Sequence, residues 1–168
     1  MTIEKPRFLT QSNSADQGDP AMIAALALQV VVNGKIQLSR AHVSRVHDQG
    51  TARSNTVHQM FELAAQRSHY ENAPGGKVQL DARMLRTLVE LSRYYSFTVS
   101  EIAGGSHSKS SIHYRGVAFD VNVINGVRVS AQHPDCARFM SDCRQLGATE
   151  IIGPPQPGHG THVHVGWR

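Results

Sequence analysis

Four short stretches in the second half of the chain alternate apolar and polar residues, as the strands of a half-buried sheet do. They are FTVSEIAGG at 97–105, GVAFDVNVI at 116–124, ATEIIG at 148–153 and THVHVGW at 161–167. A stretch with helical spacing, HPDCARFMSDCRQLG at 133–147, lies between the second and the third. This pattern predicts a mixed α+β fold in which helices flank a small antiparallel sheet.

The first half of the chain is predicted to be mostly helical. Asp19 is suited to cap a helix that begins at Pro20 and continues until the Asn33-Gly34 pair ends it. A second helix is expected to start near Ser54 and to cover NTVHQMFELAAQ. The turn-rich run HYENAPGG at 69–76 then predicts a boundary between an N-terminal helical region, residues 1–75, and a C-terminal unit, residues 76–168. The N-terminal region is either an accessory module or a set of helices packed on the core.

Two segments on either side of this boundary resemble each other. They are NGKIQLSRAHVSRV at 33–46 and GGKVQLDARMLRTL at 75–88. Each predicts a glycine turn, a short strand and a helix, which Ser39 would cap in the first segment and Asp81 in the second. One such pair is too little to predict a repeat architecture.

Composition limits the function classes. A chain of 168 residues with 40% hydrophobic content can build one domain with a real core. The net charge of +4 is scattered along the chain, which argues against a nucleic-acid groove and is compatible with an anionic polymer as substrate. The longest apolar stretch, 23–32, is about half of the roughly 20 residues that a membrane helix needs. The first residues, MTIEKPRFL, show no signal-peptide pattern. We therefore expect no membrane span and a monomer.

The two cysteines, Cys136 and Cys143, lie seven residues apart in the stretch predicted to be helical. That spacing puts them on one face but about 10 Å apart along the axis, which is too far for a disulfide. Buried, free thiols are expected.

Ten histidines occur, and five of them gather near predicted strand ends in the C-terminal half. The other five, in helical or loop contexts without a carboxylate or histidine at ligand spacing, are expected to be structural or exposed: His42, His47, His58, His69 and His133. His162 and His164 stand at strand period, so both rings should project from one face, roughly 7 Å apart at the backbone. Alternation alone can produce such a pair, so it is weak as a sign of metal binding.

Adding His113 and Asp120, from SSIHYRGVAFDVN at 110–122, strengthens the prediction. Two histidines, one carboxylate and an open fourth position suit a catalytic zinc ion, which brings the pKa of its bound water to about 7. The alternative is that Asp120 caps a turn and that His113 binds the backbone.

The segments SIHYRGVAFDV and HGTHVHVGW resemble two signatures shared by zinc D-alanyl-D-alanine carboxypeptidases, murein endopeptidases and the hedgehog signalling domain. The resemblance covers about residues 76–168 and does not extend to residues 1–75. It implies that His113, Asp120 and His164 bind zinc. It also implies that His162 is a catalytic base or stabilises the transition state, and that His159 is a further active-site histidine.

The same resemblance implies an enzyme, a zinc metallopeptidase that hydrolyses peptide bonds of bacterial peptidoglycan near D-amino acids. Either an endopeptidase or a D,D-carboxypeptidase fits. Without a signal peptide, the chain would be made in the cytoplasm and act on the cell wall or periplasm after release or secretion. A phage-type endolysin or a delivered effector has these properties.

Two departures from the family pattern affect the site. The dipeptidase branch has an acidic residue three positions before the last zinc histidine, where this chain has Thr161, so His162 must take that role. The arginine that grips a substrate carboxylate in many carboxypeptidases is missing from AGGSHSKSS, which favours an endopeptidase or a different clamp. Candidate substrate-binding residues are His107, Lys109, Arg115 and the motif serine, Ser111. An ordinary loop role is the alternative for His107 and Lys109, and an exposed strand-edge role is the alternative for Arg115.

Two other classes of function remain open. The first is a non-catalytic zinc-containing binding domain of the hedgehog-like type. The presence of His159 and His162 argues against it, because a site without turnover needs no further histidines. The second is a non-haem iron centre. The order His, Asp, His fits that class poorly, since its usual signature pairs a histidine and a carboxylate two residues apart.

Overall fold

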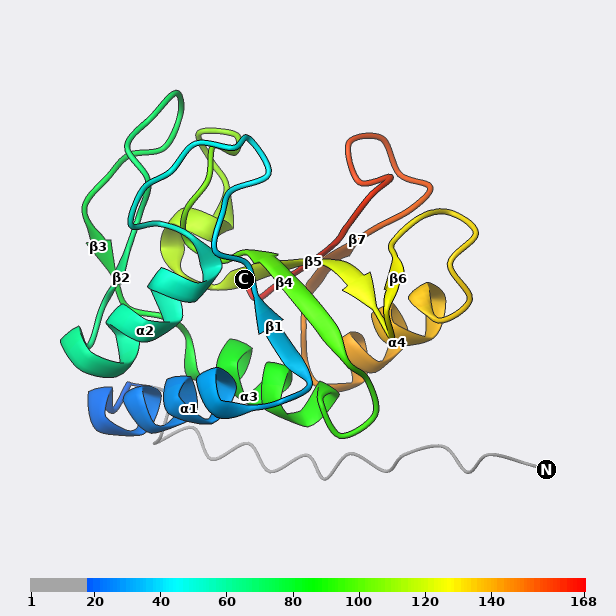
Figure 1. Cartoon of the computed structure of the whole chain (residues 1–168), viewed down its shortest axis with the longest axis horizontal. Helices are drawn as coiled ribbons and strands as arrows, with labels where there is room; N and C mark the ends of the chain where they lie inside the picture. The colour runs from blue at the N-terminus through cyan, green and yellow to red at the C-terminus, as the bar shows by residue number, and fades with distance from the viewer. Residues whose placement is uncertain (1–17) are drawn as a thin grey trace.

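The computed structural model describes residues 18–168, and a six-stranded sheet forms its centre (Figure 1). The strand order is β1-β4-β5-β8-β7, with β6 beside β5. Every pairing is antiparallel except that of β1 with β4. A second, two-stranded antiparallel sheet joins β2 (Ala65–Gln66) to β3 (Lys77–Val78). The strands of the main sheet are β1 (Ile36–Leu38), β4 (Phe97–Glu101), β5 (Ala118–Ile124), β6 (Val127–Arg128), β7 (Glu150–Ile152) and β8 (Val163–Gly166).

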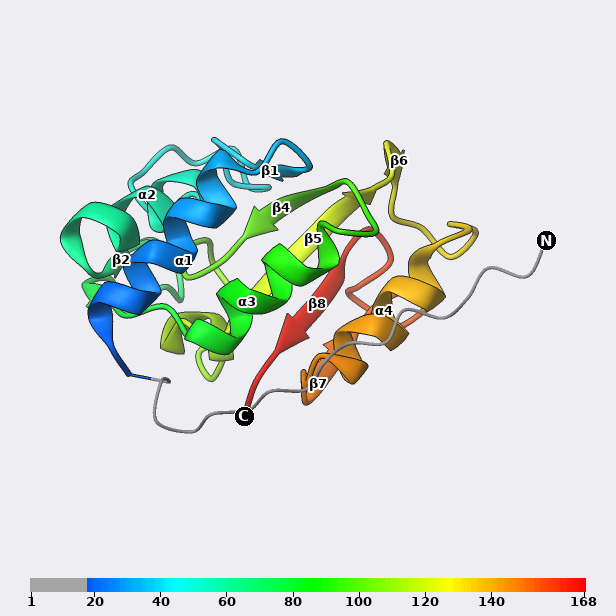
Figure 2. The same ribbon diagram turned by 90° about the horizontal axis from the view of Figure 1, so that it is seen from below.

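Helices cover one face of this sheet. Figure 2 shows α1, α3 and α4 on the same side, with α3 crossing over the central strands. Their apolar side chains join those of β5 and β8 in one core, which includes Phe119, Val121, Val163 and Val165. The helices are α1 (Pro20–Val32), α2 (Ala52–Glu62), α3 (Ala82–Leu91) and α4 (Cys136–Gln145). The predicted α+β class, with a mostly antiparallel sheet flanked by helices, is confirmed.

Side-chain caps fix where the predicted helices begin. The carboxylate of Asp19 accepts a hydrogen bond from the N–H of Ala21 at the start of α1, and that of Asp81 accepts one from Arg83 at the start of α3. The second helix ends sooner than predicted, at Glu62. Leu63 takes a left-handed conformation (φ 61°), and the chain then enters β2, so the helix cannot continue.

The described part of the N-terminal region packs on the core. Strand β1 lies parallel to β4 and completes the edge of the sheet. Ile23 and Val30 of α1 belong to the same buried cluster as Leu85 and Leu88 of α3. These contacts join residues 18–75 to the core of the main sheet. Residues 1–17, including the stretch inspected for a signal peptide, lie outside the described residues.

The predicted similarity of the segments 33–46 and 75–88 holds only for their strands. Asp81 caps α3, whereas Ser39 caps no helix and uses its hydroxyl to bond the backbone of Ala41. The prediction of a helix after Ser39 was wrong. The chain turns there instead, with Arg45 at a positive φ of 65°, and carries the buried side chain of His42 to two carboxylates.

The structure also bears on the cysteines and on membrane-spanning helices. Cys136 and Cys143 are buried and free, as expected from their spacing on one helix. No helix among residues 18–168 combines the length and the apolar character that crossing a membrane requires.

The alternation along β5 and β8 places polar side chains on the face opposite the helices. Phe119 and Val121 point into the core, so Asp120 between them points to the other face. On β8, Val163 and Val165 likewise enclose His164. Asp120 and His164 are direct register partners, which brings their side chains together.

Candidate metal centre

A single 3₁₀ turn before β5 holds His113 in place. The turn spans Ile112–Arg115, and the hydroxyl of Ser111 caps it by accepting a hydrogen bond from the N–H of His113 at 3.3 Å. Gly116 ends the turn in a left-handed conformation (φ 71°), and a Cβ there would collide with the carbonyl oxygen of Gln79. Only glycine fits this position, so the tight turn that precedes the strand depends on it.

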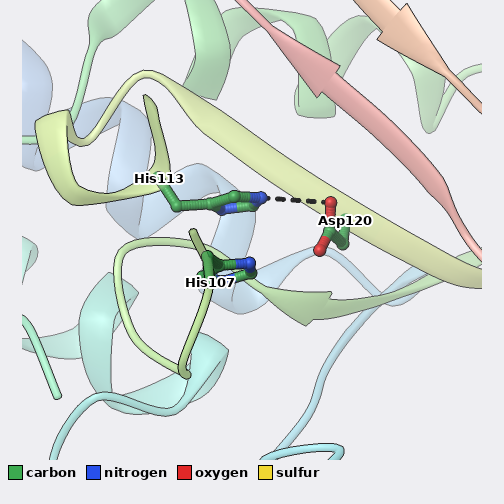
Figure 3. Close-up of side chains that lie close together, drawn as sticks. All are labelled: His107, His113 and Asp120. Atoms are coloured by element: carbon green, nitrogen blue, oxygen red, sulfur yellow. Dashed lines mark hydrogen bonds and ion pairs between the residues drawn. The ribbon is translucent and has the colours of Figure 1, made fainter. Parts of the chain in front are cut away.

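Three ligand-type atoms from His113, Asp120 and His164 converge on one point. His113 Nε2 lies 3.1 Å from Asp120 Oδ1 (Figure 3), and His164 Nδ1 lies 3.0 Å from the same oxygen. The two nitrogens are 3.0 Å apart. Bonds of 2.0–2.1 Å in a tetrahedral site place ligand atoms about 3.3 Å from one another. The observed triangle is within a few tenths of an ångström of that spacing.

The opposite nitrogen of each ring is already occupied. His113 Nδ1 donates to the carbonyl oxygen of Ile102, and His164 Nε2 donates to Glu150 Oε1 at 3.2 Å. When the two rings are neutral, the remaining nitrogen of each directs its lone pair at the carboxylate oxygen of Asp120. Three acceptors this close together are stable only around a positive charge, which is either a proton or a metal ion.

Electrostatics keep the carboxylate of this group ionised. Burial would raise the pKa of Asp120, but the charges and hydrogen bonds of His113 and His164 outweigh it and hold that pKa well below its usual range. Burial likewise opposes the charge on His113, and Asp120 overcomes it and raises the pKa of His113. The group thus offers one anionic oxygen and two imidazole nitrogens, a set that can hold a metal ion.

A third histidine, His107, lies beside this group from the loop after β4. One ligand atom each from His107, His113 and Asp120 lie within 4.8 Å of one another (Figure 3). However, the rings of His107 and His113 are stacked, with centroids 4.0 Å apart and planes at 7°. A metal ion in the plane of one ring lies well outside the plane of the other, so the two rings cannot both bind one ion in this arrangement. His164, whose ring is inclined at 64° to that of His113, can.

His107 has a defined place nonetheless. Its Nε2 lies 3.0 Å from the carbonyl oxygen of Gly104, to which it can donate, and its backbone N–H donates to the hydroxyl of Tyr114. Burial, with a further contribution from His113, lowers the pKa of His107 to about 4. The His107 ring is therefore neutral at pH 7 and packs against the ring of His113 without adding charge.

His162 and His159 lie next to the group. His162 Nε2 is 4.0 Å from Asp120 Oδ2, and the side chain is 25% exposed, whereas His164 is buried. The ring of His159 lies 4.9 Å from that of His162 and 6.2 Å from that of His164. Burial lowers the pKa of His162; Asp120 opposes this shift, and the neighbouring histidines add to it. A neutral, partly exposed imidazole beside the group can accept a proton.

The remaining predicted residues are not brought to the group. Ser111 uses its side chain as the cap described above. Lys109 and Arg115 are exposed, and their side chains form no hydrogen bond or ion pair with the described residues. Of the four candidate substrate-binding residues, only His107 lies beside the converging ligand atoms.

A second buried cluster, centred on His42, was missed. His42 Nδ1 lies 2.8 Å from Glu101 Oε2, and its Nε2 lies 2.7 Å from Asp48 Oδ1. Burial alone would lower the pKa of His42, but the two carboxylates outweigh it and raise that pKa to about 9. Glu101 is 59 residues from His42, so no local spacing could have revealed the pairing.

The His42 cluster is neither a metal site nor a nucleophilic triad. Its two carboxylates face opposite nitrogens of one ring, so their oxygens do not converge. Ser68 Oγ lies 3.3 Å from His42 Nε2, as the nucleophile of a Ser-His-Glu triad would. Ser68 is completely buried, and a cationic His42 has no lone pair with which to accept its proton.

Comparison of the chain with protein-family models, with curated proteins and with solved structures found no match. The function is therefore inferred from the residues of this chain, their geometry and the resemblance of two motifs.

Proposed function

We propose that this protein is a zinc-dependent peptidase that hydrolyses peptide bonds in the stem peptides or cross-links of bacterial peptidoglycan. The observation that carries the proposal is the triangle of His113 Nε2, Asp120 Oδ1 and His164 Nδ1, with sides of 3.0–3.1 Å. The convergence of these atoms from two strands and a turn supports the ligand set that the family resemblance implies.

Zinc fits the donor set better than calcium or magnesium. Two imidazole nitrogens and one carboxylate oxygen form the three-ligand arrangement of catalytic zinc, which leaves a fourth position for water or substrate. Calcium and magnesium require mostly oxygen ligands. Zinc bound here would supply Lewis acidity, polarising the scissile carbonyl and activating water.

The neighbouring histidines would handle protons. His162 is neutral and lies 4.0 Å from Asp120 Oδ2, so it is placed to accept a proton from the attacking water. Once protonated, it would donate to the leaving amine or stabilise the developing oxyanion. His159, with its ring 4.9 Å from that of His162, would be a further active-site histidine beside it.

The substrate class and the place of action come from the family resemblance. We propose that the protein works as a monomer on the wall or in the periplasm, as a phage-type endolysin or a delivered effector would. The absence from AGGSHSKSS of the arginine that grips a substrate carboxylate favours an endopeptidase or a differently built clamp.

Purified peptidoglycan tests the proposal. Protein loaded with zinc should release new amino groups from it, a chelator should stop the release, and added zinc should restore it. New reducing sugar ends without new amines would mean a glycan-cleaving enzyme. One equivalent of zinc with no cleavage would favour the non-catalytic binding domain. Iron in place of zinc, measured by elemental analysis of the purified protein, would contradict both.

A further inference from the structure

Glu150, at the start of β7, lies directly behind the ring of His164. Strand β7 is the neighbour of β8, with Ile152 opposite His164 and Glu150 opposite Gly166. Glu150 Oε1 is 3.2 Å from His164 Nε2, and Glu150 Oε2 is ion-paired with the guanidinium of Arg168. The Glu150 side chain is only 19% exposed, although Arg168 is largely in solvent. Both oxygens of this carboxylate are therefore engaged.

We infer that Glu150, oriented by Arg168, is the positioning residue that presents His164 Nδ1 to the metal. This inference deepens the proposed function and rests on its metal site. A neutral imidazole carries its proton on one nitrogen only, and the hydrogen bond made by the outer nitrogen decides which one. With Glu150 accepting from Nε2–H, the lone pair of Nδ1 points at Asp120 Oδ1 and His113 Nε2, each 3.0 Å away.

The other histidine ligand is oriented differently. His113 Nδ1 donates to the backbone carbonyl of Ile102, a partner that no side-chain substitution removes. His164 depends on a side chain, and that side chain is charged. A carboxylate behind a ligating histidine also makes the imidazole more basic, which strengthens its bond to the metal. Glu150 therefore both sets the tautomer of His164 and increases its strength as a ligand.

The geometry distinguishes the positioning role of Glu150 from that of a general base and from that of an ordinary surface ion pair. A general base needs a free oxygen facing the substrate, whereas both oxygens of Glu150 are bound to His164 and Arg168. An ordinary surface ion pair such as that of Glu62 with Lys77, 2.7 Å apart with both side chains about half exposed, has no contact with the ligands. That pair supplies a matched control.

The test measures zinc affinity by competition with a chromophoric chelator at fixed pH. Glu150→Ala should weaken zinc binding by roughly 10–100-fold, the loss typical of a removed outer-shell partner. Glu150→Gln, whose amide oxygen can still accept from Nε2–H but carries no charge, should lie between Glu150→Ala and the wild type. Arg168→Ala should cause a smaller loss, and Glu62→Ala none.

Nitrogen-15 NMR of His164 supplies a readout that a purely structural role would not change. The wild-type zinc-free protein should show the Nε2–H tautomer, and Glu150→Ala should show less of it at an unchanged melting temperature. If Glu150→Ala does not fold, Glu150→Gln carries the same test. Wild-type affinity and tautomer in a folded Glu150 variant would overturn the inference. Failure of wall hydrolysis alone, with these effects present, would instead contradict the proposed substrate.

Discussion

The His113–Asp120–His164 group and the His42 cluster are both buried combinations of histidine and carboxylate, but their imidazole nitrogens are used in opposite ways. In the first, one nitrogen of each ring is satisfied from behind, and the other converges on Asp120 Oδ1 at 3.0–3.1 Å. In the second, both nitrogens of His42 point outward to different carboxylates at 2.7 and 2.8 Å. Composition alone would not distinguish the two.

This difference in how the ring nitrogens are used identifies which cluster can bind a metal ion. Around His42 both ring nitrogens donate to a carboxylate, so a proton on the ring already neutralises part of the charge. Asp48 Oδ2 is buried without a hydrogen-bond partner among the described residues, but no second acceptor of theirs converges with it on one point. Around Asp120 three acceptors face one point and need a cation between them. Convergence of acceptors, more than the number of titratable side chains, indicates a metal site.

The two clusters are also adjacent. Glu101, which binds His42, is the register partner of Asp120 across β4 and β5. The next residue, Ile102, supplies the carbonyl that orients His113. Glu101 also accepts from the backbone N–H of Val43, which ties the 40–50 loop to β4. We expect the His42 cluster to stabilise the end of β4, next to the residue whose carbonyl orients His113.

The largest effect is expected from His164→Ala. Two remaining ligands rarely hold zinc in a site that needs three, so this variant should lose stoichiometric zinc and peptidase activity together. Metal content after dialysis and amine release from peptidoglycan measure the two losses. His47→Ala, which changes an exposed loop histidine, is the control and should keep both. Retained zinc in His164→Ala would contradict the assignment of His164 as a ligand.

A loss of stability, with the metal centre intact, is expected from His42→Ala. The substitution leaves Glu101 and Asp48 buried without their cation, and breaking such a pair is typically worth 3–5 kcal/mol of unfolding free energy. Urea unfolding should show this loss, whereas His58→Ala, on a partly exposed side chain 4.0 Å from Glu62, should change stability by less than about 0.5 kcal/mol. The folded fraction of His42→Ala should still bind one zinc. Loss of zinc without loss of stability would make His42 part of the site.

A smaller effect, confined to turnover, is expected from His162→Ala. If His162 transfers protons, the variant should keep near-stoichiometric zinc and a similar melting temperature but lose on the order of 100-fold in turnover. His159→Ala should fall between His162→Ala and the wild type. Zinc loss in His162→Ala would mean that it, and not His164, is the ligand. Full turnover would assign the proton transfer to another group, such as His159.

Features encoded by local patterns were predictable. Alternation predicted β4, β5, β7 and β8, and the caps at Asp19 and Asp81 predicted the starts of two helices. The meeting of His113, Asp120 and His164 followed from a motif whose geometry is set by one turn and one strand pair. Each of these depends on residues near one another in sequence or on a register that burial of one face enforces.

Features that depend on distant partners were not predictable. Ser39 was predicted to cap a helix. Instead, the chain after it turns, and His42 contacts Glu101, which is 59 residues away in the sequence. Glu150 gained its contact with His164 only through the pairing of β7 with β8. Ser111 was expected to contact substrate because the motif contains it, and a motif does not say whether a hydroxyl points outward or caps its own turn. Long-range pairing, absent from local sequence, decides the first two cases. In the third, the hydroxyl of Ser111 caps its own turn, two residues away.

The smallest expected effect is a pH dependence that belongs to the His42 cluster alone. The pKa of His42 rises from 6.5 in the unfolded chain to about 9 in the folded protein, so folding binds an extra proton between these values. The stabilisation is complete below pH 6.5 and is lost as the pH rises through 9, with a slope of at most about 1.4 kcal/mol per pH unit. The lowered pKa of Asp48 acts in the acid range, outside this window.

Urea unfolding of the wild type and of His42→Ala in chelator, at intervals from pH 6 to 9.5, isolates this contribution. The groups that titrate in the metal centre, including His113, are common to both proteins and cancel in the difference between their unfolding free energies. That difference should shrink as the pH rises, because only the wild type loses the proton of His42. A difference that stays constant across the window would mean that His42 is not charged between Glu101 and Asp48, and that the contrast between a satisfied and a converging cluster is wrong.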